Sequence, residues 1–160
     1  MDPQAKKVAL RAINYGLYVL TAIDGDDVGA AGVNWLTQVS FEPPLIAAAV
    51  KTDSDTHRII QTTGRFAVNV LAEDQLDIAK AFFRTVTLEG DQIGGHRFEP
   101  GPETGAPLLV ELPYWFEAKV TDKVERGDHT VLVAEVVNAG VRDEKAVPLL
   151  LRSTGMNYGG

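Results

Sequence analysis

The pattern of hydrophobic and polar residues predicts strands along most of the chain. It is clearest over residues 114–124, where apolar and polar side chains alternate with the period of two that places them on opposite faces of a sheet. A turn at 126–129 then leads into a further strand over 130–137. The other predicted strands are 15–22, 29–40, 45–50, 66–71 and a short last strand in the tail from residue 148.

The first two of these strands are predicted to form a hairpin. A turn signal at residues 24–27 joins them, and the returning strand runs over 29–40. It begins with four small residues, 29–32, which indicate close approach of another backbone or of a ligand. Pro43 and Pro44 then interrupt the ladder, and the continuous apolar run 45–50 predicts a strand buried on both faces.

Two short helices are predicted between the strands. Residues 53–56 are all good N-cap residues, so a helix is expected over 56–63, with Ile59 and Ile60 facing inward and Gly64 ending it. Asp74 is the predicted cap of a second helix over 75–83. Residues 5–13 fit either a short helix or an edge strand. The glycine-rich segment 85–107 lacks a clear period and is predicted to be a long loop.

Six or seven antiparallel strands with only two short helices favour a mainly β barrel over a doubly wound sheet. A length of 160 residues suits one domain, 1–160. With 45% hydrophobic residues the chain is globular, and its net charge of −7 argues against nonspecific binding to nucleic acid or to an anionic membrane. The absence of cysteine excludes thiolate chemistry. We expect a cytoplasmic protein.

Two segments carry most of the candidate chemistry. Asn34 through Ser40 places hydrogen-bonding side chains in a strand that otherwise has the composition of an interior one, which suits either an exposed face or the edge of a ring system. Lys51, Ser54, Thr56 and His57 lie at a predicted helix N-terminus, where free N–H groups favour a phosphate. A simple helix cap explains the same residues, and Asp53 and Asp55 count against an anion.

Other kinds of site are poorly supported. The histidines at 57, 96 and 129 lack the spacing of a metal motif, so no metal site is predicted. No nucleophile-elbow motif is present, and the carboxylates are scattered. No dinucleotide glycine fingerprint occurs either. His129 follows a Gly-Asp turn, where a surface position is as good an explanation as a functional one.

In its ordered set of segments the chain resembles the flavin reductase family, the FMN-binding split-barrel proteins. The segments that carry the resemblance are 15–22, 34–44, 51–59, 64–71, Gln75, Phe82-Phe83, the Gly127-Asp128-His129 turn and the closing residues 154–160. Each is weak alone, whereas the set in family order covers nearly the whole chain. The resemblance implies a Greek-key-like antiparallel split β-barrel that forms a homodimer, with FMN or FAD near the subunit interface.

The resemblance also implies roles for particular residues. The residues implied to line the flavin ring are Asn34, Trp35, Leu36, Thr37, Gln38, Val39 and Ser40. The ribityl phosphate would be held by Lys51, Ser54, Thr56 and His57, and Phe83 and Arg84 would close over the flavin. His129 would lie near the nicotinamide as the catalytic residue, with Tyr158 approaching the same pocket.

The implied reaction is hydride transfer from NADH or NADPH to flavin, because the cofactor carries the hard chemistry. A flavin-dependent monooxygenase is the implied partner for the reduced flavin. The alternative is an FMN-bound electron carrier of the flavoredoxin kind, without efficient NAD(P)H oxidation. FMN is favoured weakly over FAD because few groups fit an adenine half. No arginine pair for a 2′-phosphate is evident, so NADH and NADPH both stay open.

Overall fold

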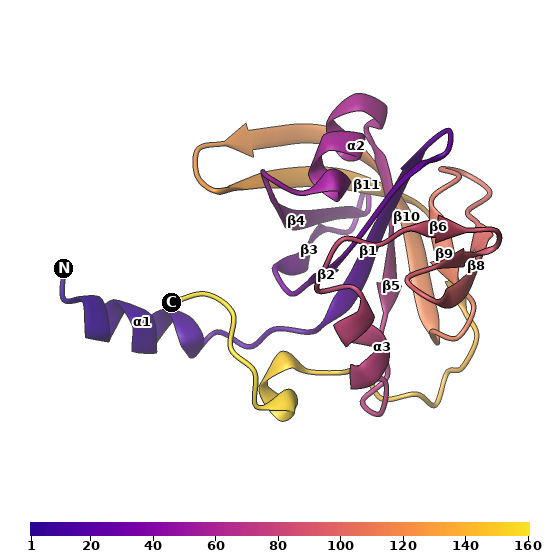
Figure 1. Ribbon diagram of the computed structural model, residues 1–160. Coiled ribbons are helices and arrows are strands. Elements are labelled where there is room, and N and C mark those ends of the chain that lie inside the picture. Colours follow the sequence, from indigo (N-terminus) through magenta and orange to yellow (C-terminus); the bar gives the residue numbers. More distant parts are fainter.

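The computed structural model describes residues 1–160 as an antiparallel sheet with short helices around it (Figure 1). The helices are α1 (Pro3–Arg11), α2 (Asp55–Thr63), α3 (Leu76–Ala81) and the 3₁₀ turn η1 (Leu151–Thr154). The main strands are β1 (Tyr18–Asp24), β2 (Asp27–Val33), β3 (Leu36–Ser40), β4 (Leu45–Lys51), β5 (Arg65–Val70), β10 (Tyr114–Glu125) and β11 (His129–Val141). A smaller sheet holds β6 (Leu88–Glu89), β7 (Gln92–Ile93), β8 (His96–Pro100) and β9 (Pro107–Leu109).

The main sheet curls back on itself. Its seven strands follow the order β2-β1-β5-β10-β11-β4-β3, so β2 and β3 are its two edges. Yet these edges are joined in sequence by Asn34 and Trp35 alone. Two edge strands separated by two residues must lie close in space, so the sheet bends into a barrel that stays open between them. The predicted mainly β, split-barrel class is confirmed.

One hydrophobic core fills the inside of this curled sheet. Its buried members come from strands spread across the sheet, including Leu20 on β1, Phe66 on β5, Leu132 on β11 and Ile46 on β4. Strands that are not neighbours in the sheet thus share one cluster, as expected for the inside of a curled sheet. A second cluster lies beneath α3 and the tail, and includes Leu71, Phe82 and Leu149.

Helix α2 forms as its sequence predicts. Ser54 is the N-cap, and its side chain accepts a hydrogen bond from the backbone N–H of His57 at 3.1 Å. Ile59 and Ile60 are buried against the sheet, and Gly64 ends the helix in the left-handed conformation at φ 66°. The cap and the two isoleucines fix the helix start, with its free N–H groups, beside β2 and β4.

Two strand predictions need correction. The segment 29–40 is not one returning strand, because the chain leaves β1 after Val33 and pairs with β4 from Leu36 onward. Its polar residues therefore lie on an edge strand rather than in a hairpin. The run 45–50 is not buried on both faces: alternate side chains are buried and half-buried, because only one face of β4 meets the core.

Other segments also differ from expectation. The predicted loop 85–107 contains the short strands β6 to β8, whose two-residue pairings are too brief to produce a period in the sequence. Asp74 does not cap α3, since the cap position is Gln75 and no side chain caps it. The tail forms single bridges and the turn η1 in place of a last strand. Segment 5–13 is largely helical, as α1.

The alternation over 114–124 places Glu117 on the polar face of its strand, yet its side chain is fully buried. Its carboxylate accepts hydrogen bonds from the backbone N–H groups of Glu103 and Thr104 and from the Asn138 amide. These donors satisfy the charge, which explains how a carboxylate sits inside the molecule. Glu117 thereby fixes the loop before β9 against β10.

Helix α1 extends from the body of the molecule beside the C-terminal tail, and none of its residues is buried (Figure 1). The tail is fastened to it by a hydrogen bond of 3.1 Å from the Arg11 Nε to the Gly159 carbonyl oxygen. Both ends of the chain thus meet on one side of the barrel. None of the helices has the length and hydrophobicity needed to cross a bilayer.

Candidate functional site

A cavity of about 630 Å³ opens where the two edges of the sheet come together. Its walls are β2, the Asn34-Trp35 connection, the start of α2, the segment after α3 and the tail. Nine of the predicted site residues line it: Asn34, Trp35, Lys51, Ser54, Thr56, Phe83, Arg84, His129 and Tyr158. Residues that are distant in sequence are brought together here because the barrel closes at this point.

The Asn34-Trp35 connection between the two edge strands is called the seam below. Two polar nitrogens at this seam have no partner within the chain. The side-chain Nδ2 of Asn34 and the indole Nε1 of Trp35 are buried and donate no hydrogen bond. A buried donor without an acceptor costs about 1–3 kcal/mol. Both residues line the cavity, but the two nitrogens themselves have almost no exposed surface, so an acceptor on a ligand removes this cost only when the groups that cover them shift.

The small residues of β2 give the cavity its shape. A Cβ on Gly29 would lie 2.7 Å from the Cα of Thr56, and one on Gly32 would lie 2.6 Å from the Phe83 ring. Both distances are shorter than carbon atoms tolerate. The close approach predicted at 29–32 is therefore by α2 and by Phe83, and it places both against the cavity wall.

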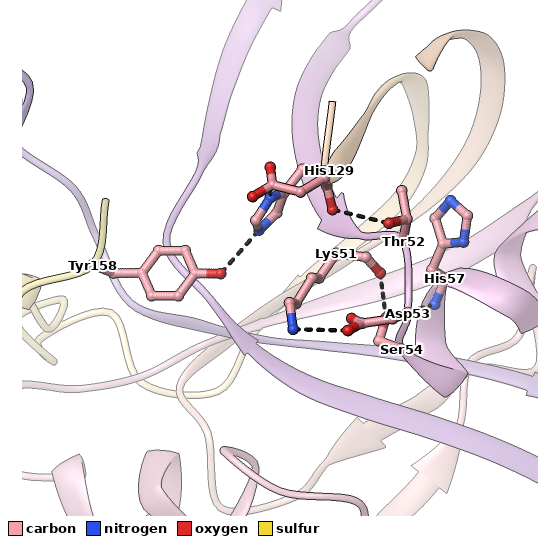
Figure 2. A network of polar contacts seen from close by, with 8 residues as sticks. Lys51, Thr52, Asp53, Ser54, His57, His129 and Tyr158 are labelled. Atoms are coloured by element: carbon pink, nitrogen blue, oxygen red, sulfur yellow. Dashed lines mark hydrogen bonds and ion pairs between the residues drawn. The ribbon is translucent and has the colours of Figure 1, made fainter. Parts of the chain in front are cut away.

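The corner formed by residues 51–54 is already hydrogen-bonded within itself, as Figure 2 shows. Lys51 Nζ lies 2.9 Å from Asp53 Oδ2, and this contact raises the pKa of Lys51 and lowers the pKa of Asp53. The Ser54 hydroxyl donates to the Lys51 carbonyl at 2.8 Å while it caps α2. Because the lysine and the aspartate are more than half exposed, water or an anion can replace their contact.

His129 is held from both of its ring nitrogens (Figure 2). Nδ1 lies 2.8 Å from Asp128 Oδ1, and Nε2 lies 2.9 Å from the Tyr158 hydroxyl. Trp35 packs on the histidine ring with centroids 4.7 Å apart and meets Tyr158 at 5.3 Å. The result is a cluster of three rings at one end of the cavity.

Two titrations in this cluster are shifted. The hydrogen bond with His129 lowers the pKa of Asp128, and burial raises the pKa of Tyr158. Asp128 is therefore ionised and Tyr158 protonated at neutral pH. The carboxylate accepts at Nδ1, and the Tyr158 hydroxyl is the polar neighbour of Nε2.

Six predicted site residues do not line the cavity. Leu36, Thr37, Gln38, Val39 and Ser40 follow β3 outward along the sheet edge. The polar ones bond locally, Thr37 to the Gln38 carbonyl and Gln38 to the Ser40 carbonyl. Pairing with β4 is the reason, because it turns the chain away from the cavity after Trp35.

The sixth is His57. Its ring turns away from Lys51, as Figure 2 shows, and its Nε2 lies 2.8 Å from the Thr130 hydroxyl. Helical geometry explains this position, since successive helix residues point about 100° apart and Thr56 already faces the cavity. His57 contributes its backbone N–H to the Ser54 cap.

The sequence reasoning missed several lining residues. Asp53, the counter-ion of Lys51, was weighed only as evidence against an anion. The segment after α3 also contributes Thr85 and Val86, and the tail contributes Met156 and Asn157. Neither segment has a period or motif that places it at a site, so only the closure of the barrel reveals them.

The donor set suits a flat molecule with an anionic end. Unpartnered N–H groups and aromatic faces lie at the seam, and a lysine beside a helix N-terminus lies at the adjoining corner. Acceptor atoms on the rim of a ring system would meet the Asn34 and Trp35 donors once the groups that cover these two nitrogens shift. A phosphate would meet Lys51 and the first N–H groups of α2.

Comparison with known proteins supports one family. Residues 10–160 match the model of the flavin reductase like domain. A Rhizobium meliloti (strain 1021) protein named "Probable flavin reductase" is 34% identical over 137 residues, which cover 84% of this chain. The chain spans 42% of the length of that relative and a smaller share of two further relatives.

Solved structures agree with this result. The Streptomyces globisporus NADH:FAD oxidoreductase SgcE6, in complex with NAD and FAD fragments, superposes with a TM-score of 0.82. It is 28% identical, and the match covers 100% of this chain and 95% of that one. The styrene monooxygenase flavin reductase SMOB of Pseudomonas putida S12 has a TM-score of 0.75 at 27% identity, covering 93% and 91% of the two chains.

Proposed function

The chain belongs to the flavin reductase-like family, and we propose on this basis that it binds a flavin in the seam cavity and reduces it with NADH or NADPH. The observation that carries the proposal is the pair of buried, unpartnered donors, Asn34 Nδ2 and Trp35 Nε1, in the wall of that cavity. The rim of an isoalloxazine ring is rich in carbonyl and imine acceptors, and it would satisfy them. FMN and FAD both carry such a ring.

The remaining lining residues bind different parts of the flavin. Lys51 and the N–H groups at the start of α2 hold the phosphate, with the Ser54 cap fixing the helix in place. Phe83 and Arg84 cover the flavin, and the small residues of β2 leave room for it. These contacts orient the ring and keep bulk water away from its reactive face.

When a flavin is bound, it provides the group that accepts the hydride from the nicotinamide. The two electrons of the C–H bond move with this hydride. The chain itself needs to position the nicotinamide and to exclude water. His129 does so from the end of the cavity, where Asp128 fixes its tautomer and Trp35 supports its ring. Tyr158 holds its proton at neutral pH, and its hydroxyl lies 2.9 Å from His129 Nε2, which keeps both side chains in place.

The test is steady-state oxidation of NADH and of NADPH by the purified protein with added FMN or FAD. We expect flavin-dependent oxidation well above the rate without protein. If FMN binds in a fluorescence titration but neither nucleotide is oxidised, the flavoredoxin-like alternative is the correct one. A protein that fails to bind FMN at all would exclude both.

His129 gives the sharper prediction. His129→Ala should lower kcat/KM for the nicotinamide nucleotide about 10- to 100-fold, the range for loss of a positioned polar group, while the flavin dissociation constant changes less than threefold. Flavin titration and steady-state kinetics measure the two effects separately. Equal losses in both would contradict its assignment to the nicotinamide side.

We also propose that two copies of the chain associate with the flavin near their interface, and that a flavin-dependent monooxygenase uses the reduced flavin. Support for the first comes from Val39 on the edge strand β3 and from Phe41 in the turn after it, which are 52% and 87% exposed. Support for the second comes from the likeness to the SMOB flavin reductase. Sedimentation measures the first, and product formation with added oxygenase measures the second.

A further inference from the structure

A second pocket, of about 370 Å³, lies beside the seam cavity on the side of the two chain ends. Residues from the end of α1 and from η1 form it, together with the tail. Four residues line both pockets: Leu151, Met156, Asn157 and Tyr158. This tail segment is therefore the boundary between the two pockets. A ligand with one end against His129 reaches the second pocket by extending past it.

Two arginines from opposite ends of the sequence line this pocket. Arg11 is the last residue of α1, and Arg152 lies in η1. The Arg11 guanidinium donates only its Nε, to the Gly159 carbonyl, and Arg152 makes one long contact of 3.4 Å to the Asn14 amide oxygen. Most of their N–H donors are unused.

The charge around these arginines is distinctive for this chain. Acidic residues outnumber lysine and arginine by 22 to 15, yet no lining residue of the second pocket is acidic. Neither arginine takes part in any ion pair of the structure. Two guanidinium groups without ion pairs, in a hollow without acidic side chains, suit a dianion, and phosphate matches their fork geometry.

We infer that Arg11 and Arg152 bind a phosphate group on the adenosine half of the nicotinamide nucleotide. The inference rests on the proposed function, because that function places the nicotinamide beside His129 and thus the rest of the nucleotide near the tail. The sequence shows no arginine pair, because the two residues come together only when α1 and η1 pack around the tail. Tyr158 and Asn157 then separate the hydride-transfer end from the phosphate end.

Direct binding of nucleotide fragments tests this without flavin or turnover. We would titrate 2′,5′-ADP and 5′-AMP into the wild type, Arg11→Ala and Arg152→Ala by isothermal calorimetry. Each substitution should weaken binding about 10-fold, as expected for a lost charge-assisted contact. Arg97→Ala is the matched control, because Arg97 pairs with Asp91 on the other sheet, and it should leave binding unchanged.

The two probes also locate the phosphate. If only 2′,5′-ADP is affected, and KM rises for NADPH but not for NADH, the arginines hold the 2′-phosphate. If both probes and both nucleotides are affected alike, they hold the 5′-phosphate that the two nucleotides share. Unchanged binding of both probes in both variants would overturn the inference, and so would a loss confined to FAD affinity.

A further variant separates charge from fastening of the tail. Arg11→Lys keeps the charge but loses the Nε donor to Gly159. Because lysine keeps the charge but lacks the guanidinium fork, Arg11→Lys should bind the nucleotide more weakly than the wild type and more tightly than Arg11→Ala, whereas a loss as large as in Arg11→Ala would overturn the charge's role. If neither nucleotide is oxidised yet the fragments bind through the arginines, the phosphate site stands and the proposed function fails.

Discussion

The two ends of the seam cavity differ in what their polar groups do before any ligand arrives. At the Asn34-Trp35 connection, two buried nitrogens have no acceptor. At the Lys51 corner, the lysine, the Ser54 hydroxyl and the helix cap all have partners within the chain. The first end is costly until something binds, whereas the second is stable by itself.

Because of this difference, the two ends are not equally strong evidence that a ligand binds. A hydroxyl that caps a helix has a structural role that would exist without any ligand, so Ser54 alone says little about phosphate. An unpartnered buried donor has no such explanation, because folding would ordinarily remove it. The seam is therefore the stronger evidence for a cofactor, and the corner is a place that such a cofactor can use.

The largest test of this comparison sets Asn34 against Asn69. Asn69 is also buried, but its amide donates to the Val19 and Pro107 carbonyls and accepts from the Leu109 N–H. Asn69→Leu should lower the free energy of unfolding by about 3 kcal/mol, because it leaves several buried backbone groups unpaired. Urea titration of the flavin-free protein measures this.

Asn34→Leu should behave in the opposite way. Removing a donor that has no partner leaves the flavin-free protein as stable as before or slightly more stable. Flavin affinity should instead fall by about 1–2 kcal/mol, measured by fluorescence titration. Marked destabilisation without flavin would mean that Asn34 has a structural partner, and unchanged flavin affinity would remove it from the site.

A smaller effect is expected at the corner. Ser54→Ala should lower the free energy of unfolding by about 1 kcal/mol through loss of the α2 cap, with a lesser change in FMN affinity. Ser40→Ala on the exposed edge strand makes no such cap and should stay within about 0.5 kcal/mol of the wild type. If FMN affinity falls far more than stability in Ser54→Ala, the hydroxyl is a phosphate ligand first and a cap second.

The sequence predicts the local elements near this site well and the long-range ones poorly. Helix α2 follows from the cap residues, from Ile59 and Ile60, and from Gly64, all within a few positions of one another. The split of 29–40 into β2 and β3 depends instead on which strand Leu36 pairs with. The segment from Leu36 onward could continue to pair with β1 or could pair with β4, and no local pattern distinguishes these two partners.

The same reason explains which predicted site residues lie outside the cavity. The resemblance to a family identified the segment 34–40, but only Asn34 and Trp35 reach the cavity, because the chain turns outward at Leu36. His57 and Thr56 are neighbours in sequence, yet helical geometry sends one ring away and leaves the other side chain at the wall. Arg11 and Arg152 could not be assigned to one pocket from sequence, since their shared position depends on how both chain ends pack.

The smallest effect concerns Asp53, the counter-ion of Lys51. In the free protein the Asp53 carboxylate forms an ion pair with the lysine that would bind a phosphate. Asp53→Asn should therefore strengthen FMN binding about two- to threefold, which is the scale of an exposed ion pair. Riboflavin, which has no phosphate, is the matched probe and should bind both proteins equally. The gain should shrink between 0.05 and 0.5 M salt, since the pair is exposed and salt screens it. Weaker FMN binding in Asp53→Asn would show instead that Asp53 positions Lys51. The corner would then be a preorganised phosphate site, in which Asp53 helps to orient the lysine.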